Sequence, residues 1–400
     1  MKVSVVFVVF AIGLLCAMSA PAATFYIEPD GSGDASTIQA GIEIANAGDT
    51  VLLAAGTFTG TGNYNIDFLG KAITVTSESG PEVTVIDCEQ NGRGFIFQNG
   101  EGLSSVLAGV TIQNGNSGIF EDGGAISCES ASPTITGNII QNNEAGSGGG
   151  GIACNMSAPE IVGNMIIGNS APGQEGGGIW LWFSDAFIGN NVIRDNEASY
   201  GAGIYAIMNS APQIVGNVVY NNSAFSFGGG ILLNGGAATI SVNVIYGNDA
   251  NYGAGIATEN VDGSTLISQN TLSENHAHSG TGGNIYASGS PTIEHTIMAY
   301  STSGEGLYCN TPASQPVVTC CLIFGNAGGD ALCGVDGGNN LFVDPGFCGT
   351  IGSHNYLLQS DSPCAPTNNP CVMLIGARDV GCGTSGFEKA SWGEVKSLYR

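Results

Sequence analysis

A repeat of about 26 residues is the feature that most constrains how this chain can fold. From Gly123 onward, a glycine-rich group that ends in isoleucine returns at a nearly constant interval. The isoleucines of six such groups are 26, 27, 25, 27 and 25 residues apart: Ile126, Ile152, Ile179, Ile204, Ile231 and Ile256. Self-similarity at a fixed period of this size is typical of solenoids, in which each repeat packs against its neighbours only.

Each repeat holds three short apolar runs separated by tight corners, so its strands turn too sharply to form hairpins. They can instead pair in parallel with the equivalent strands of the next repeat, about 4.8 Å away. The sequence therefore predicts an all-β fold, namely a parallel β-helix solenoid of about 10–12 coils.

Two asparagines recur between successive isoleucines, in the phrase Asn-x-aliphatic-x-x-Asn-x-Ala. An asparagine at a corner tolerates the left-handed conformation, and amides stacked one coil apart can hydrogen-bond to each other. We therefore expect two structural ladders. One is formed by Asn138, Asn164, Asn191, Asn217, Asn243 and Asn270, and the other by Asn143, Asn169, Asn196, Asn222, Asn248 and Asn275.

The two ends of the chain do not repeat and are expected to differ in role. Lys2 is followed by an apolar run and then by small residues, which predicts a cleaved signal peptide, with a membrane anchor as the alternative. Ser36 to Asn46 reads as a short amphipathic helix that begins with a capping box. The expected segments are a signal peptide at 1–22, an N-terminal cap and first coil at 23–60, the parallel β-helix at 61–345, a disulfide-tied C-terminal cap at 346–382, and a tail at 383–400 that could form a short helix.

The chain is strongly acidic, with 8 Lys and Arg against 33 Asp and Glu and a net charge of −25. Such a chain is repelled by phosphate backbones and by anionic lipid surfaces, so nucleic-acid binding is not expected. No later segment is apolar enough to span a bilayer, and we expect no integral membrane segment in the mature chain. The partner that we expect is a polysaccharide or a surface protein.

Most of the 12 cysteines lie late in the chain, which indicates an oxidising compartment. Cys128 and Cys154 fall two residues after repeat isoleucines on adjacent coils, so they are either stacked core thiols or a disulfide. The compartment favours the disulfide. No cysteine spacing resembles a zinc site, and His276, His278 and His295 are too isolated to be predicted as ligands. We therefore expect neither a metal nor another cofactor.

Side chains that alternate with the repeat isoleucines should point away from the interior. Trp180, Trp182 and Tyr205 are of this kind and could stack against sugar rings or a protein partner. Packing beneath a neighbouring turn is the alternative for these aromatic residues. Two carboxylates at a suitable separation can hydrolyse a glycosidic bond, and weaker catalytic candidates of this type, with a nearby arginine, are Asp185, Arg194 and Asp195.

The repeat also carries a family resemblance. Gly-Gly-Ala-Ile at 123–126, with an aliphatic-x-x-Asn phrase at 140–143, resembles the repeats of the chlamydial polymorphic outer membrane proteins. More broadly, it resembles the bacterial right-handed parallel β-helix proteins of the pectin-lyase-like superfamily. The phrase from Asp30 to Phe58 is similar to the opening of pectinesterases. The resemblance implies a right-handed coil and a bacterial outer-membrane or extracellular location.

The same resemblance leaves the activity open, because this fold hosts lyases, hydrolases, esterases and non-enzymatic surface proteins. The catalytic motifs of pectinesterases, polygalacturonases and pectate lyases are not found in the chain, which has no Asp-Asp pair. We therefore predict a secreted or cell-surface, non-catalytic β-helix protein for adhesion or for carbohydrate or partner binding. The alternative is a polysaccharide-active enzyme, either a lyase or a glycoside hydrolase.

Overall fold

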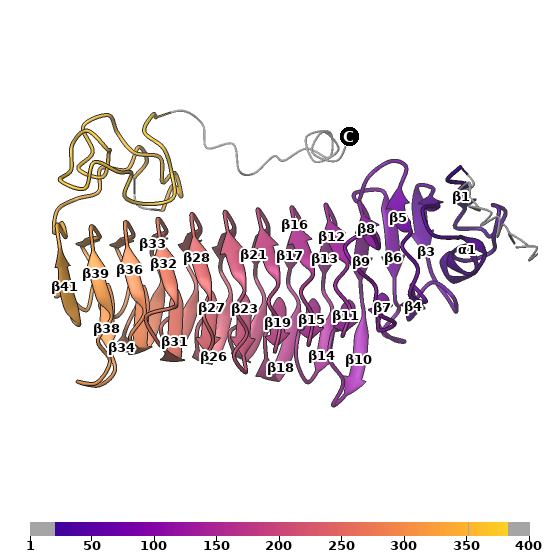
Figure 1. The fold of residues 1–400 in the computed structure, drawn as a ribbon, viewed down its shortest axis with the longest axis horizontal. Coiled ribbons are helices and arrows are strands. Elements are labelled where there is room, and N and C mark those ends of the chain that lie inside the picture. The colour runs from indigo at the N-terminus through magenta and orange to yellow at the C-terminus, as the bar shows by residue number, and fades with distance from the viewer. Residues whose placement is uncertain (1–20, 351, 383–400) are drawn as a thin grey trace, which may run out of the picture.

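A computed structural model describes residues 21–350 and 352–382 of the chain. The predicted tail helix at 383–400 and nearly all of the predicted signal peptide at 1–22 lie outside these described residues. Figure 1 shows a long rod in which short strands stack one coil above another. It is the predicted right-handed parallel β-helix, and it has about 12 turns. None of the described residues forms a helix long and apolar enough to cross a bilayer.

Four parallel sheets, called A to D here, make the sides of the rod. Sheet A has 13 strands: β1 (Thr24–Ile27), β2 (Thr50–Leu53), β5 (Thr74–Ser77), β8 (Val106–Ala108), β12 (Thr134–Thr136), β16 (Glu160–Val162), β20 (Phe187–Gly189), β24 (Gln213–Val215), β28 (Thr239–Ser241), β32 (Leu266–Ser268), β36 (Thr292–Glu294), β39 (Val317–Thr319) and β41 (Val335–Gly338). Sheet B has 11 strands: β3 (Gly56–Phe58), β6 (Thr84–Asp87), β9 (Thr111–Gln113), β13 (Ile139–Gln141), β17 (Met165–Ile167), β21 (Val192–Arg194), β25 (Val218–Tyr220), β29 (Val244–Tyr246), β33 (Thr271–Ser273), β37 (Ile297–Ala299) and β40 (Leu322–Phe324).

Sheets C and D complete each coil. Sheet C has 10 strands: β4 (Ile66–Asp67), β7 (Phe95–Phe97), β11 (Ile126–Glu129), β15 (Ile152–Asn155), β19 (Ile179–Trp182), β23 (Ile204–Ile207), β27 (Ile231–Asn234), β31 (Ile256–Val261), β35 (Ile285–Gly289) and β38 (Leu307–Cys309). Sheet D has 7 strands: β10 (Asn116–Ile119), β14 (Glu144–Gly146), β18 (Ser170–Glu175), β22 (Glu197–Tyr200), β26 (Ser223–Phe227), β30 (Asp249–Tyr252) and β34 (His276–Thr281). A regular coil therefore runs C, A, B, D.

The repeat isoleucines are the core of this rod. Ile126 is the register partner of Ile152, and Ile152 that of Ile179, so equivalent side chains stack directly along the axis. All three are fully buried. Because successive strand residues point to opposite faces, the residue two positions after each isoleucine points inward as well, as Cys128 and Cys154 do.

Both asparagine ladders are present in the structure, and their side chains are buried. Each amide nitrogen donates to the amide oxygen of the next asparagine at 2.9–3.1 Å. The expectation that these asparagines adopt the left-handed conformation is wrong. The residue before each one does so, for example Gly216 at φ 71° and Asp195 at φ 57°, because that residue turns the chain and leaves the asparagine pointing inward.

The predicted disulfide between Cys128 and Cys154 does not form. The two are register partners on β11 and β15, and both remain buried free thiols, which was the alternative. Neighbouring parallel strands hold their side chains side by side in the same direction, which is a poor geometry for a disulfide. The late cysteines do pair, as Cys309–Cys333, Cys320–Cys371 and Cys348–Cys382.

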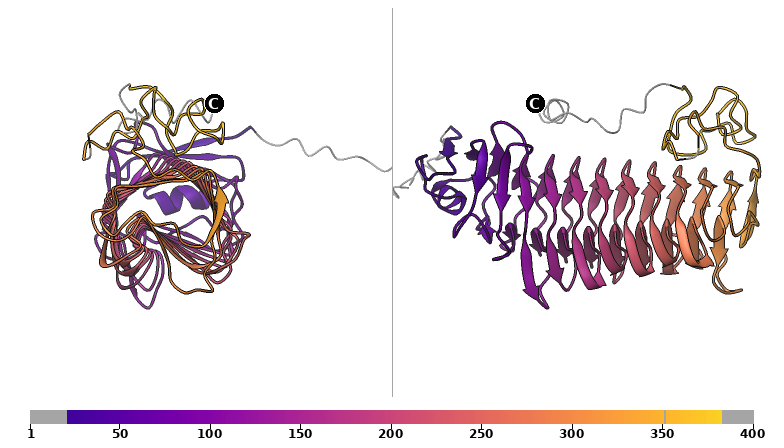
Figure 2. Two further views of the ribbon diagram at one scale, coloured as in Figure 1. Left: turned by 90° about the vertical axis from the view of Figure 1, so that its left-hand side faces the viewer. Right: turned by 180° about the vertical axis from the view of Figure 1, so that it is seen from behind.

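A single short helix, α1 (Ile38–Ile44), closes the N-terminal end among the described residues. Figure 2, left, shows it lying across the opening of the coils. The helix is shorter than predicted, and its N-cap is Thr37, whose hydroxyl accepts a hydrogen bond from the backbone of Ala40. The expected capping box is wrong, because the Gln39 side chain instead bonds both backbone groups of Asp67 on the next coil.

The C-terminal segment 346–382 does not lie across the far end of the rod. It folds back along one side, as the yellow trace of Figure 1 shows, and packs on the outer face of sheet B. The backbone N–H of Ala377 donates to Thr271 Oγ1 at 3.0 Å, and Leu358 packs with Ile297 and Leu322. Outward apolar side chains of the last coils are thereby removed from water.

Candidate functional site

Two of the three predicted stacking aromatics are covered in the structure. The side chains of Trp180 and Tyr205 point away from the coil interior as predicted, but they are only 2% and 3% exposed. They belong to an apolar cluster outside the coil interior that also holds Leu232 and Tyr286. Trp180 Nε1 donates to Glu175 Oε2 at 3.0 Å, and burial raises the pKa of the Tyr205 phenol. Only Trp182 keeps an exposed ring.

The three catalytic candidates are not assembled into one site. Arg194 and Asp195 form an ion pair at the corner between sheets B and D. Asp185 lies at a different corner, between β19 and β20, where its carboxylate accepts a hydrogen bond from the Ala211 backbone at 2.8 Å. Asp195 also occupies a left-handed corner position. These carboxylates therefore do not face each other across a common space.

A groove of about 520 Å³ lies instead on the outer face of sheet B. Its floor is an apolar row contributed by five successive strands: Ile139, Met165, Val192, Val218 and Val244. The loop at Pro81–Glu82 borders it toward the N-terminal end, and the segment 346–382 overhangs it toward the C-terminal end. Five parallel strands span four interstrand spacings, so the groove is about 19 Å long.

An aromatic row stands beside this apolar floor. The rings of Tyr220 and Tyr246 are parallel, with centroids 4.8 Å apart and planes inclined by 4°. His354 from the C-terminal segment continues the stack at 4.4 Å from Tyr246. The guanidinium of Arg194 lies 6.0 Å from the Tyr220 ring centroid on the other side, within the range of a cation–π contact. The Arg194 guanidinium and the rings of Tyr220, Tyr246 and His354 thus form one row along the rod.

Two of the four Lys and Arg side chains in the described residues line this groove, Arg194 and Arg378. The other two hold the fold: Lys71 donates to three carbonyl oxygens at the end of α1, and Arg93 pairs with Glu121. Burial lowers the pKa of Arg378 to about 10, although Asp379 opposes the shift, so this arginine stays charged at neutral pH.

The C-terminal end of the groove is held by hydrogen bonds between the fold-back and the rod. Tyr356 donates its hydroxyl proton to Glu274 Oε1 at 3.0 Å. Burial raises the pKa of Tyr356 far above its usual range, and the Glu274 charge adds to that shift, so the phenol remains a donor. His354 Nε2 lies 3.9 Å from the other oxygen of Glu274. These contacts fix the position of the overhang.

A second group of side chains gathers on the outer face of sheet D, at the end of that sheet. Asp249 on β30 and His276 on β34 are register partners, and His278 follows on the same face of β34. One ligand atom from each of the three lies within 4.8 Å of the others. Sequence reasoning missed this cluster, although its signal was present: Asp249 precedes His276 by 27 residues, which is one repeat.

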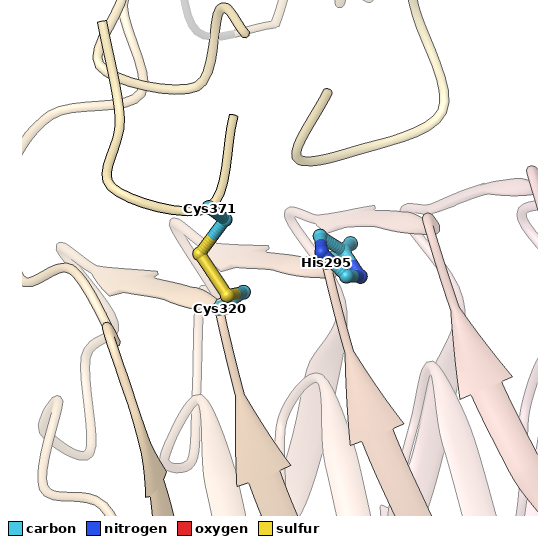
Figure 3. Close-up of side chains that lie close together, drawn as sticks. All are labelled: His295, Cys320 and Cys371. Carbon is cyan, nitrogen blue, oxygen red and sulfur yellow. A yellow bond between two sulfur atoms is a disulfide. The ribbon is translucent and has the colours of Figure 1, made fainter. Parts of the chain in front are cut away.

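A third group has the residue types of a metal site but cannot act as one. His295 lies near Cys320 and Cys371, as Figure 3 shows. The two sulfur atoms are joined in a disulfide, so neither is available as a thiolate.

Comparisons with known proteins agree with this architecture. A family model described as right handed beta helix region matches residues 202–356, and one described as periplasmic copper-binding protein (NosD) matches residues 24–224. No curated protein sequence matches significantly. The fold is shared with a structure titled the complex structure of XylC with xylose, at 12% identity, 75% coverage of each chain and a TM-score of 0.51. It is also shared with pectate lyase Pel9A, at 12% identity, 90% and 97% coverage and a TM-score of 0.52. At this identity the likeness shows the fold alone.

Proposed function

Because the chain belongs to the family of the periplasmic copper-binding protein NosD, we propose that it is an exported β-helix protein that binds ligands on its sides without turning them over. Three disulfides among the described residues support an oxidising compartment outside the cytoplasm. The observation that carries the proposal is the groove on sheet B. Its ligand in this proposal is an extended, uncharged glycan of a cell-surface or extracellular polysaccharide.

The shape and lining of the groove support a glycan. Sugar rings present apolar C–H faces and a rim of hydroxyl groups, and aromatic side chains bind such faces well. Here an apolar row lies beside the Tyr220–Tyr246 stack. The apolar row repeats once per coil, so the groove matches a linear chain of similar units better than a compact ligand.

The charges of the groove favour a neutral chain over a polyuronate. Arg194 is paired with Asp195, and Asp379 adjoins Arg378, so both cations have a local counter-charge. Glu82 adds negative charge at one end of the groove, and at the other end Glu274 lies behind Tyr356, whose hydroxyl donates to it. The whole chain carries a net charge of −25, which repels a polyanion at long range.

The arrangement of the carboxylates supports binding rather than turnover. Glycoside hydrolysis by two carboxyl groups needs both of them on opposite sides of one bond. Asp185 lies at another corner, and Glu274 accepts a hydrogen bond from Tyr356. A polysaccharide-active enzyme remains the alternative function that the binding assay must also score.

Copper, which the family description names, requires accessible nitrogen, sulfur or oxygen donors. The five free cysteines of the described residues are all buried, so they offer no accessible thiolate. Asp249, His276 and His278 offer two imidazoles and a carboxylate on the surface, and this donor set suits Cu(II). The residues of this chain therefore fit the ion.

The test is a panel of neutral and acidic polysaccharides, scored for retention of the protein and for release of products. We expect retention of a neutral glycan without products, and weaker binding after Tyr220→Ala by about 1 kcal/mol, or roughly fivefold. Tyr26→Ala removes an exposed ring far from the groove and is the matched control, with unchanged retention expected. Equal retention of Tyr220→Ala and the wild type would reject the groove. Product release that disappears in Asp195→Asn would instead establish the enzyme.

A further inference from the structure

We infer that Asp249, His276 and His278 form a binding site for a divalent transition-metal ion on the outer face of sheet D. Side chains two apart on a strand point the same way, so His276 and His278 share the surface while Ala277 between them is buried. Parallel pairing places Asp249 directly beside His276, one coil away. The site depends on the repeat register alone and is independent of the groove on sheet B.

The distances leave room for an ion with small side-chain movements. His278 Nε2 lies 2.7 Å from Asp249 Oδ1, and the two imidazole rings have centroids 4.9 Å apart at an angle of 77°. Metal–nitrogen and metal–oxygen bonds are about 2.0–2.2 Å long, so bound donors stand about 3–3.5 Å from each other. The His278 side chain is 54% exposed and can rotate by the amount required. The ion would take the place of the proton that now joins His278 and Asp249.

A neighbouring hydroxyl holds one of the two histidines. Thr302 Oγ1 lies 3.0 Å from His276 Nδ1, which leaves Nε2 of this imidazole for a metal. Metal-binding histidines usually donate their second ring N–H to such a partner, which sets the tautomer and the ring direction. Thr302 is therefore a positioning residue for His276 and does not touch the ion.

The donor set selects the class of ion. Two imidazoles with one carboxylate suit Cu(II), Zn(II) or Ni(II), whereas Mg²⁺ and Ca²⁺ prefer oxygen ligands and Cu(I) prefers sulfur. Three protein ligands at an exposed place leave further coordination positions open to water. Such a site exchanges its ion with solution, which fits uptake or delivery of a metal better than a closed structural site.

The test uses tag-free, disulfide-bonded protein titrated with Cu²⁺ and, separately, with Zn²⁺. Calorimetry gives the stoichiometry and affinity, and electron paramagnetic resonance of the Cu²⁺ complex reports nitrogen ligands directly. We expect one ion per chain, bound at least about tenfold more weakly by His276→Asn, His278→Asn or Asp249→Asn. Thr302→Val should reduce the affinity only a few-fold, with the nitrogen signal retained.

His295→Asn is the matched control, because it makes the same substitution at the disulfide-blocked cluster and Asn tolerates the left-handed backbone there. It should bind like the wild type. Urea unfolding of each variant confirms that the surface substitutions leave the rod folded. The proposal is overturned if His276→Asn and His278→Asn both keep wild-type affinity and spectra, if His295→Asn loses binding equally, or if the wild type binds no ion. Glycan retention in His278→Asn should stay unchanged.

Discussion

Replacing Asn217 with alanine should weaken the coil directly beneath the groove. Its amide takes part in five hydrogen bonds. The nitrogen donates to the carbonyls of Ile188 and Val215 and to the amide oxygen of Asn243, at 2.8, 3.3 and 3.0 Å. The oxygen accepts from the backbone and the side chain of Asn191, at 2.9 and 3.0 Å. Asn217 is fully buried, so water does not replace these partners without opening the corner.

The expected cost follows from these bonds. The substitution leaves the backbone N–H of Asn191 without its acceptor in a buried place, which costs about 1–3 kcal/mol. The lost bonds to Ile188 and Asn243 each add about 0.5–1.5 kcal/mol. Some relaxation of the corner offsets part of this sum. We therefore expect Asn217→Ala to lower the free energy of unfolding by about 2–4 kcal/mol.

Urea unfolding followed by circular dichroism measures this change. Asn91→Ala is the matched control, since Asn91 is exposed and lies outside both ladders, and it should stay within about 0.5 kcal/mol of the wild type. A difference between the two variants of less than about 1 kcal/mol would refute the claim that the buried ladder holds the corner. Binding at the groove should fall as well, because Val218 and Tyr220 follow Asn217 directly in β25.

Two further predictions concern other contacts. Burial raises the pKa of Glu175 above 4.5 and the charge of Asp122 adds to the shift, although the hydrogen bond from Trp180 opposes it. A carboxyl group whose pKa is higher in the folded chain than in the unfolded chain stabilises the fold below about pH 4.5, and this contribution is lost as the pH rises. Glu175→Gln should therefore raise the melting temperature at pH 7 and leave it unchanged at pH 4. A lower melting temperature at pH 7 would contradict this sign. Replacing both Cys320 and Cys371 with serine opens a loop with a sequence separation of 51, which should cost about 4 kcal/mol in the chain-entropy model. Urea unfolding measures the loss, and protease sensitivity confined to 346–382 would show that the fold-back is released; an unchanged urea midpoint would argue against the tether.

The repeat was predictable because its determinants are local and periodic. Ile152 and Asn164 need only the next copy of the same phrase, one coil away, to find their partners. Spacing therefore predicted the coil and the members of both ladders, together with the inward or outward direction of each strand residue. It did not predict which residue turns the corner, because Asn217 and Gly216 are both compatible with a left-handed backbone.

The alternation of side chains along a strand predicts which way each one points, but it does not predict which neighbouring residues cover it. Trp180 and Tyr205 point outward as the alternation indicates, yet both are buried in a cluster outside the coil interior. Cys128 and Cys154 lie on adjacent coils as expected, yet they remain free thiols because side chains on neighbouring parallel strands have a poor geometry for a disulfide. These outcomes depend on packing between elements, which a one-dimensional period does not contain.

The same distinction between local spacing and tertiary packing applies to the candidate sites. The amino-acid sequence alone determined the rod, its stacked core and the absence of the known catalytic motifs of related enzymes. Only the tertiary structure decided where the segment 346–382 lies, and hence that His354 and Arg378 reach the Tyr220–Tyr246 row. The physical reason is range: a ladder contact joins residues one repeat apart, whereas the contact of Ala377 with Thr271 joins residues 106 apart, after the repeat has ended. The repeat of about 26 residues does not relate such positions, so the spacing of residues in the sequence could not predict the groove.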